Sequence, residues 1–184
     1  AVDIHALNLV DLSAVKTAVV LGLGGIGFPA AMLLQKRCEV IGIETARQKM
    51  EIARRFRLEV LDGRGDVRKA LAGKRIDLCV DAVGGTAPTF NLGLSLLRKE
   101  GTLLCVSQRH KFEMEFPPLG FRELTIKGVF AHCPEDFRAA VELVGSESWP
   151  QAMITARYKL ADFGDALKAA CSGEQLKVVI SCAD

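Results

Sequence analysis

The feature that most limits how this chain can fold is a glycine-rich turn between an apolar run and a pattern of small helical residues. Residues 17–21 (TAVVL) form a continuous apolar run, which is typical of a strand buried on both faces. Gly22, Gly24 and Gly27 follow with the spacing G-x-G-x-x-G. In that pattern the first glycine permits a tight turn, the second lets a pyrophosphate approach the backbone, and the third lets the helix pack closely on the strand. The sequence therefore predicts a dinucleotide-binding turn.

An acidic residue ends the next predicted strand, residues 39–43. Glu44 lies twenty-two residues after Gly22, close to the spacing of about 20 that dinucleotide sites show. A carboxylate there accepts both hydroxyls of the adenosine ribose and repels the 2′-phosphate of NADP, so NAD is favoured. Arg47 keeps NADP open, because a nearby Arg accommodates that phosphate. The alternative is a fold that uses these glycines for packing alone.

Strands and helices alternate along the rest of the chain. Further strands are predicted at 59–61, 77–82, 102–106 and 124–130, and a helix from Pro134 is expected to direct Phe137, Val141 and Val144 inward. Alternation of this kind predicts an α/β fold with a doubly wound, six-stranded parallel sheet, the Rossmann architecture. After residue 146 a shorter β-α-β pattern follows. We therefore expect a dinucleotide-binding domain over residues 1–148 and a C-terminal tail over 149–184.

The charge balance and the low aromatic content argue against two classes of binding partner. Lys and Arg number 24 against 22 Asp and Glu, and aromatic residues make up 6%, so we expect no nucleic-acid or membrane partner. The uncharged run over residues 18–34 is shorter than the ~20 apolar residues of a membrane span. Six cysteines without C-x-x-C spacing indicate reduced thiols in a cytoplasmic protein.

Other chemistries find less support in the sequence. Arg68 stands where the first glycine of a Walker motif would have to be, before Gly73 and Lys74. A methyltransferase also binds a nucleoside on a glycine-rich turn, but the wider spacing here suits a pyrophosphate. His132 and Cys133 follow the sixth predicted strand, where a metal or a nucleophile is conceivable. We interpret them as a loop before the helix, because no second His or acidic residue clearly joins them in the sequence.

Several segments together resemble the coenzyme-binding domain of the medium-chain dehydrogenase/reductase family, which contains alcohol, polyol and threonine dehydrogenases. AVVLGLGGIG and EVIGIETARQKMEIARRF resemble its first two strands, and IDLCVDAVGG, GTLLCVS and ELTIKGVF resemble its fourth, fifth and sixth. The resemblance implies that the coenzyme is bound by the turn, by the end of the second strand and by the exits of strands four to six. The residues concerned are Gly22, Gly24, Gly25, Ile26, Gly27, Glu44, Arg47, Lys49, Val83, Ser107 and Phe130.

Two residues depart from the family pattern. Most members have Asp where this chain has Glu44, and Arg57 stands where members often have a helix-ending Gly, which is expected to strain the helix cap. Short-chain dehydrogenases need Tyr-x-x-x-Lys as a proton donor. Tyr158 is the one tyrosine here, and Asp162 follows it at that spacing, so that family is not indicated.

The resemblance also implies a catalytic domain, carrying zinc ligands and the substrate pocket, that would precede Ala1. The opening AVDIHALNLV resembles the linking helix between the two domains, with His5 where members often carry His. We therefore expect the coenzyme domain of an oxidoreductase that moves hydride between an alcohol and NAD, without turnover by itself and with zinc only in the other domain. A homodimer through the sixth strand is expected. The alternative is a non-catalytic module that senses NAD(P) or mediates dimerisation.

Overall fold

The computed structural model describes residues 1–85, 88–108, 113–114 and 116–182. Six parallel strands form the main sheet in the order β3-β2-β1-β4-β5-β6, the order of a Rossmann fold. Their bounds are β1 (Thr17–Leu21), β2 (Glu39–Glu44), β3 (Glu59–Asp62), β4 (Ile76–Asp81), β5 (Leu97–Cys105) and β6 (Thr125–Gly128). The predicted fold class is confirmed.

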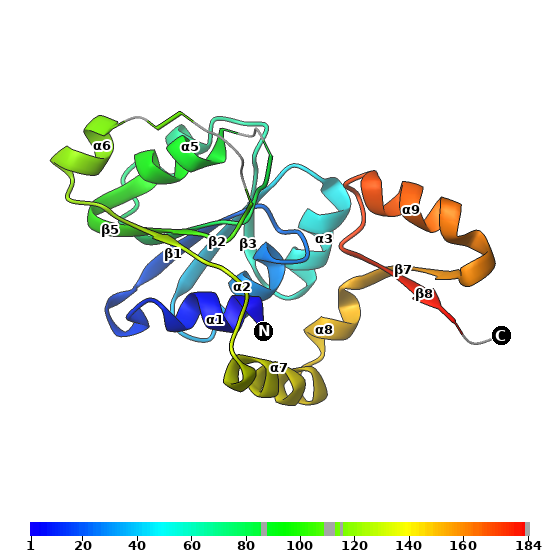
Figure 1. The fold of residues 1–184 in the computed structure, drawn as a ribbon. Helices are drawn as coiled ribbons and strands as arrows, with labels where there is room; N and C mark the ends of the chain where they lie inside the picture. The colour runs from blue at the N-terminus through cyan, green and yellow to red at the C-terminus, as the bar shows by residue number, and fades with distance from the viewer. Residues whose placement is uncertain (86–87, 109–112, 115, 183–184) are drawn as a thin grey trace.

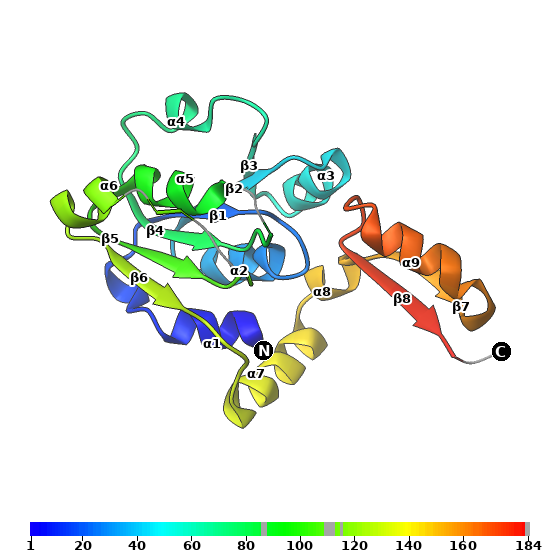
Figure 2. The ribbon, with the colours of Figure 1, turned by 45° about the horizontal axis from the view of Figure 1, so that its top comes forward.

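Helices cover both faces of this sheet. In Figures 1 and 2, α1 and α5 lie on opposite sides of the strands. The helices and 3-10 turns of the sheet domain are α1 (Val2–Asn8), η1 (Leu12–Ala14), α2 (Gly27–Leu34), α3 (Arg47–Arg55), α4 (Val67–Ala70), α5 (Thr89–Leu96), α6 (Phe116–Phe121) and α7 (Pro134–Ser146). The sequence also predicts Thr86 as a helix cap, but this residue lies outside the described residues.

Alternate residues of the central strands enter two separate cores. Ala18 and Val20 of β1 pack with Phe28 of α2 on one face, whereas Val19 and Leu21 pack with α5 on the other. All five of these side chains are almost completely buried. This double burial explains why the predicted strand 17–21 is continuously apolar instead of alternating with polar residues.

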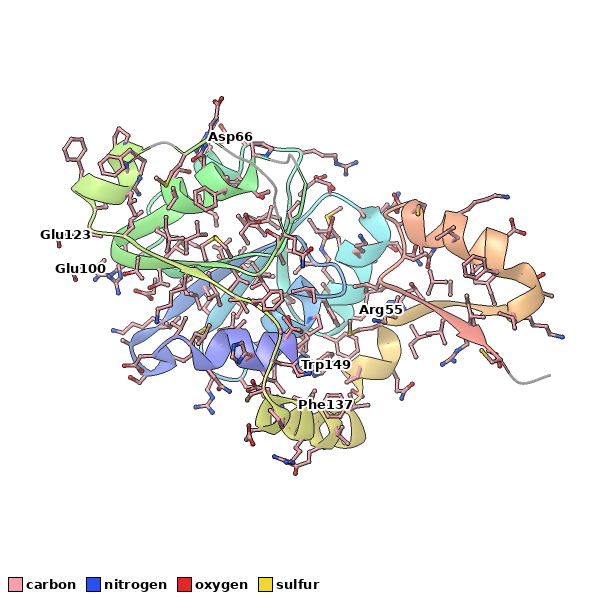
Figure 3. The ribbon with its side chains drawn as sticks, viewed as in Figure 1. Arg55, Asp66, Glu100, Glu123, Phe137 and Trp149 are labelled. Atoms are coloured by element: carbon pink, nitrogen blue, oxygen red, sulfur yellow. The ribbon has the colours of Figure 1, made fainter. Side chains whose placement is uncertain are left out.

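The tail forms a small unit of its own beyond α8 (Trp149–Ala152). It contains β7 (Ile154–Lys159), η2 (Leu160–Asp162), α9 (Phe163–Cys171) and β8 (Lys177–Ser181), and the two strands pair in parallel. Figure 1 shows this unit extending away from the main sheet. Trp149, labelled in Figure 3, joins the two parts, because its ring lies 6.0 Å from that of Phe28 in an edge-to-face contact.

Some predicted details are wrong. Phe137, Val141 and Val144 of α7 do not face the core, since each side chain is more than half exposed. Strand β6 ends at Gly128, before Phe130, while β5 begins at Leu97, five residues before the predicted start. The apolar spacing on α7 identified the helix correctly, but an amphipathic pattern does not reveal whether the chain itself covers the apolar face.

The expectation for Arg57 is confirmed. Arg57 follows α3 with a φ of 61°, in the left-handed region that favours glycine and costs other residues roughly 1–2 kcal/mol. Within the described ranges, no helix combines the length and the apolar character needed to cross a membrane.

Candidate functional site

The glycine turn has the tight geometry that its spacing predicts. Gly22 has a φ of +80°, and a Cβ atom there would lie 2.5 Å from Cγ2 of Val83. At Gly27 a Cβ atom would lie 1.7 Å from the carbonyl oxygen of Gly22, so no other residue fits. Gly24 differs, because a Cβ atom there would meet no atom within 4 Å. The turn is thus packed at both ends and open in its middle, toward the N-terminus of α2.

A cavity of about 470 Å³ lies at the carboxyl ends of β1, β2 and β4. Ligands of open α/β sheets bind at this edge, where the strand order reverses. Five predicted site residues line the cavity, namely Gly22, Gly24, Glu44, Lys49 and Val83, together with nine others: Leu21, Ile43, Thr45, Gly63, Ala82, Gly84, Pro88, Thr89 and Leu92. Residues from four separate segments of the sequence therefore share one hollow.

Glu44 connects the second strand to the glycine turn. The residue is 9% exposed, and its carboxylate accepts hydrogen bonds from three backbone amides: Leu23 at 2.8 Å, Thr45 at 2.7 Å and Ala46 at 3.0 Å. Oε1 accepts from the Thr45 and Ala46 amides, while Oε2 accepts from Leu23 alone among the residues that the structure describes. Since each carboxylate oxygen has about two acceptor positions, Oε2 keeps one for a ligand.

The other predicted residues are not among those that line this cavity. Gly25, Ile26 and Gly27 continue the turn into α2, which begins at Gly27. The side chain of Arg47 is 86% exposed and its Nε donates to Glu51 at 2.9 Å. Phe130 lies beyond the end of β6 with its side chain 83% exposed.

Ser107 follows β5 at the same edge of the sheet. Its amide donates to the carbonyl oxygen of Asp81 at 3.2 Å, which places it beside the end of β4. Its hydroxyl oxygen is buried and has no hydrogen-bond partner in the described part of the chain. A buried hydroxyl without a partner is unfavourable by itself, and it offers a hydrogen bond to a bound ligand.

Sequence reasoning missed Asp81, which closes β4 as Glu44 closes β2. Its side chain is fully buried and accepts hydrogen bonds from the Val83 amide at 3.1 Å and the Thr89 hydroxyl at 2.9 Å. Asp81 thereby positions two lining residues of the cavity. An acid at the end of a buried apolar strand was the signal that identified Glu44, and the same signal is present in IDLCVD.

Cys133 lies in the loop directly before α7, as predicted, but the expectation that no acidic residue or second His joins it is wrong. The Cys133 thiol lies 2.9 Å from Oδ2 of Asp136, and Nδ1 of His5 lies 2.8 Å from the same oxygen. His132 is not part of this group and stacks on Phe137 instead. The bond to the Asp136 carboxylate raises the pKa of the Cys133 thiol, which argues against a free thiolate nucleophile.

Comparisons with known proteins agree with this geometry. Residues 22–146 match the family described as zinc-binding dehydrogenase. The D-xylulose reductase of Saccharomyces cerevisiae is 27% identical over 183 residues, covering 91% of this chain and 51% of that protein. The chain spans about half the length of the curated relatives it matches.

Solved structures share the fold. The 2R,3R-butanediol dehydrogenase from Bacillus subtilis superposes with a TM-score of 0.85 at 19% identity, over 100% of this chain and 55% of that one. TarJ of S. aureus, in complex with NADPH, gives a TM-score of 0.83 at 18% identity, over 98% of this chain and 60% of that one. Likeness at this level of identity shows the fold alone.

Proposed function

Because the chain belongs to the zinc-binding dehydrogenase family, we propose that it is the NAD-binding domain of an oxidoreductase that acts on an alcohol or a polyol. The observation that carries this proposal is the position of Glu44, whose carboxylate lies at the glycine turn inside the 470 Å³ cavity. The curated relatives are polyol enzymes, which supports a sugar alcohol or another secondary alcohol as the substrate.

In the proposed pose the dinucleotide lies extended along the carboxyl edge of the sheet. Oε2 of Glu44 accepts one adenosine ribose hydroxyl, instead of the two expected from the sequence. The Leu23 amide takes one acceptor position of Oε2, and the Thr45 and Ala46 amides take those of Oε1. The open side of Gly24 and the N-terminus of α2 receive the pyrophosphate. Val83, the unpartnered hydroxyl of Ser107 and the backbone near Phe130 hold the nicotinamide end. The coenzyme supplies the hydride chemistry, while the protein supplies position and electrostatics.

Charge supports NAD over NADP. In the proposed pose the 2′-phosphate of NADP would approach the Glu44 carboxylate, and two like charges repel each other strongly in a partly buried site. Arg47, the residue that would favour NADP, is exposed and paired with Glu51. Lys49 lines the cavity and is positioned to bind the ribose.

An apolar surface supports the proposal that a further, catalytic domain packs on this one. A second hollow of about 400 Å³, lined by Asp3, Val144 and Trp149 among others, lies between α1, α7 and the tail. Asp3 Oδ1 and Trp149 Nε1 are buried there without hydrogen-bond partners among the described residues. In the longer protein we place the zinc and the substrate pocket in that second domain, which packs against residues 1–148 and the tail 149–184.

Calorimetric titration with NAD and with NADP tests the proposal. We expect micromolar binding of NAD, much weaker binding of NADP, and no reduction of NAD by the isolated 184-residue chain with simple alcohols or polyols. Tighter binding of NADP would assign the ribose site to Arg47. Binding of neither coenzyme would contradict the proposed site, and turnover by the chain alone would contradict the need for a second domain.

A further inference from the structure

Three side chains of different metal-binding types meet where α1 passes the start of α7. His5 comes from α1. Cys133 directly precedes α7, and Asp136 lies in the first turn of that helix. Figures 1 and 2 both show α1 beside α7, although the two helices are far apart in the sequence. None of the three residues lines the coenzyme cavity, so this group is separate from the proposed NAD site.

The ligand atoms of the group already lie close together. His Nδ1 and Cys Sγ are 2.8 Å and 2.9 Å from Oδ2 of Asp136, and one ligand atom of each residue lies within 4.8 Å of the others. In a tetrahedral zinc site, bond lengths of about 2.0–2.3 Å separate the ligand atoms by roughly 3.3–3.6 Å. A metal ion would take the place of the hydrogen-bonding protons between these atoms. For this, each ligand atom would have to move by less than about 1 Å.

We propose that His5, Cys133 and Asp136 bind one Zn²⁺ ion. A set of one sulfur, one imidazole nitrogen and one carboxylate oxygen suits zinc and does not suit Mg²⁺ or Ca²⁺, which prefer oxygen ligands alone. Three protein ligands leave the fourth position to water. The site is accessible, because the side chain of His5 is 28% exposed.

The surrounding residues support Asp136 as a ligand. Asn8 Nδ2 donates to Oδ1 at 3.0 Å, and the amide of Cys133 donates to Oδ2 at 3.0 Å. Such outer hydrogen bonds orient metal-binding carboxylates. The N-terminus of α7 carries a partial positive charge of about one half, which opposes a cation, but a thiolate and a carboxylate together contribute two negative charges and outweigh it.

A zinc ion here would bind α1 to the segment that follows β6. That segment leads back from α7 to Phe130, near the proposed nicotinamide end of the coenzyme site. The metal would thus stabilise the position of α1 against the sheet domain. In the structure, hydrogen bonds of His5 and Cys133 with Asp136 already connect α1 to the start of α7.

Metal titration of the chelator-treated 184-residue protein tests the proposal. We expect one equivalent of Co²⁺ to produce a near-ultraviolet charge-transfer band from the thiolate, and one equivalent of Zn²⁺ to remove that band and to raise Tm. Cys133→Ser should abolish the band and weaken Zn²⁺ binding at least tenfold. Serine is a better helix N-cap than cysteine, so this variant is expected to fold.

Matched variants separate this site from adventitious binding. Cys171→Ser removes an exposed cysteine on α9 and should leave both titrations unchanged, while His5→Gln and Asp136→Asn should each weaken Zn²⁺ binding at least tenfold. Absence of the cobalt band in the parent protein would overturn the proposal. So would a band that survives Cys133→Ser, or one that Cys171→Ser removes.

Discussion

The Glu44 carboxylate accepts a hydrogen bond from the backbone amide of Leu23 at 2.8 Å. This bond joins the end of β2 to the middle of the glycine turn, so the acid supports the shape of the turn as well as facing the cavity. The glycine turn and the predicted ribose acceptor, Glu44, are therefore joined directly by this hydrogen bond, so a change in one is expected to affect the other.

Glu44→Gln removes the charge with little change in size. We expect NAD affinity to fall about tenfold or more, because a hydrogen bond to a charged group contributes about 1.5–3 kcal/mol, and the preference for NAD over NADP to shrink. Calorimetry with both coenzymes measures this. Glu51→Gln, on the neighbouring helix and exposed, is the control and should bind NAD as the parent does. Equal losses in both variants would contradict the assigned role.

Substitutions at Gly24 and Gly27 should have different effects, the first on NAD affinity and the second on stability. Gly24→Ala adds a methyl group into open space, so we expect stability within about 0.5 kcal/mol of the parent and at least a tenfold loss of NAD affinity. Gly27→Ala places a carbon against the Gly22 carbonyl and should lower the free energy of unfolding by several kcal/mol. Urea unfolding and calorimetry distinguish the two. If Gly24→Ala bound NAD as tightly as the parent protein does, the proposal that the pyrophosphate lies at this turn would be wrong.

Arg57→Gly should stabilise the protein. Glycine adopts the positive φ of this position without the penalty that other residues incur, so we expect a gain of roughly 0.5–1 kcal/mol in the free energy of unfolding. The backbone carbonyl of Arg57 still accepts the bond from Gln35. Arg55→Gly, at the last residue of α3 and labelled in Figure 3, is the control and should lower the free energy of unfolding, because glycine is a poorer helix former than arginine. Destabilisation by both variants would contradict the interpretation.

Asp3 makes stability depend on pH. Burial raises its pKa from 3.8 to about 7, so the unfolded chain loses this proton at a lower pH than the folded protein does. Stability is therefore fully present below about pH 4 and falls as the pH rises to about 7, by about 4 kcal/mol at most from three units at ~1.4 kcal/mol each. Asp3→Asn should flatten this dependence in urea unfolding between pH 5 and 8. An unchanged slope would show that Asp3 is ionised in the folded protein.

The edge strand β6 predicts a dimer. Among the strands that the structure describes it has one neighbour in the sheet, β5, and exposed edges favour pairing with a second chain. We expect sedimentation to give twice the chain mass of 19.9 kDa. Gly128→Lys should yield monomers, whereas Gly145→Lys, on α7 and equally unobstructed, should remain dimeric. A parent protein that sediments as a monomer at micromolar concentration would refute this arrangement.

Local patterns predicted much of the site. Strand β1, the turn from Gly22 to Gly27 and the acid at Glu44 follow one another in the chain, and their hydrogen bonds and steric limits act over a few residues or between adjacent parallel strands. For the same reason Arg57 was recognisable as a strained helix end. Asp81 was within reach of the same reasoning, because it also closes a buried strand.

The sequence by itself determined the strand and helix order, the glycine turn and the choice of an acid at the end of β2, because these depend on backbone sterics and on the period of apolar residues. The tertiary structure decided which apolar faces remain uncovered, as the exposed Phe137 on α7 shows. It also decided how many hydrogen-bond acceptor positions of Glu44 remain for a ligand. It also brought His5 to Asp136 across 131 residues. Such contacts depend on how helices pack across a finished sheet, and no pattern of neighbouring residues encodes that packing.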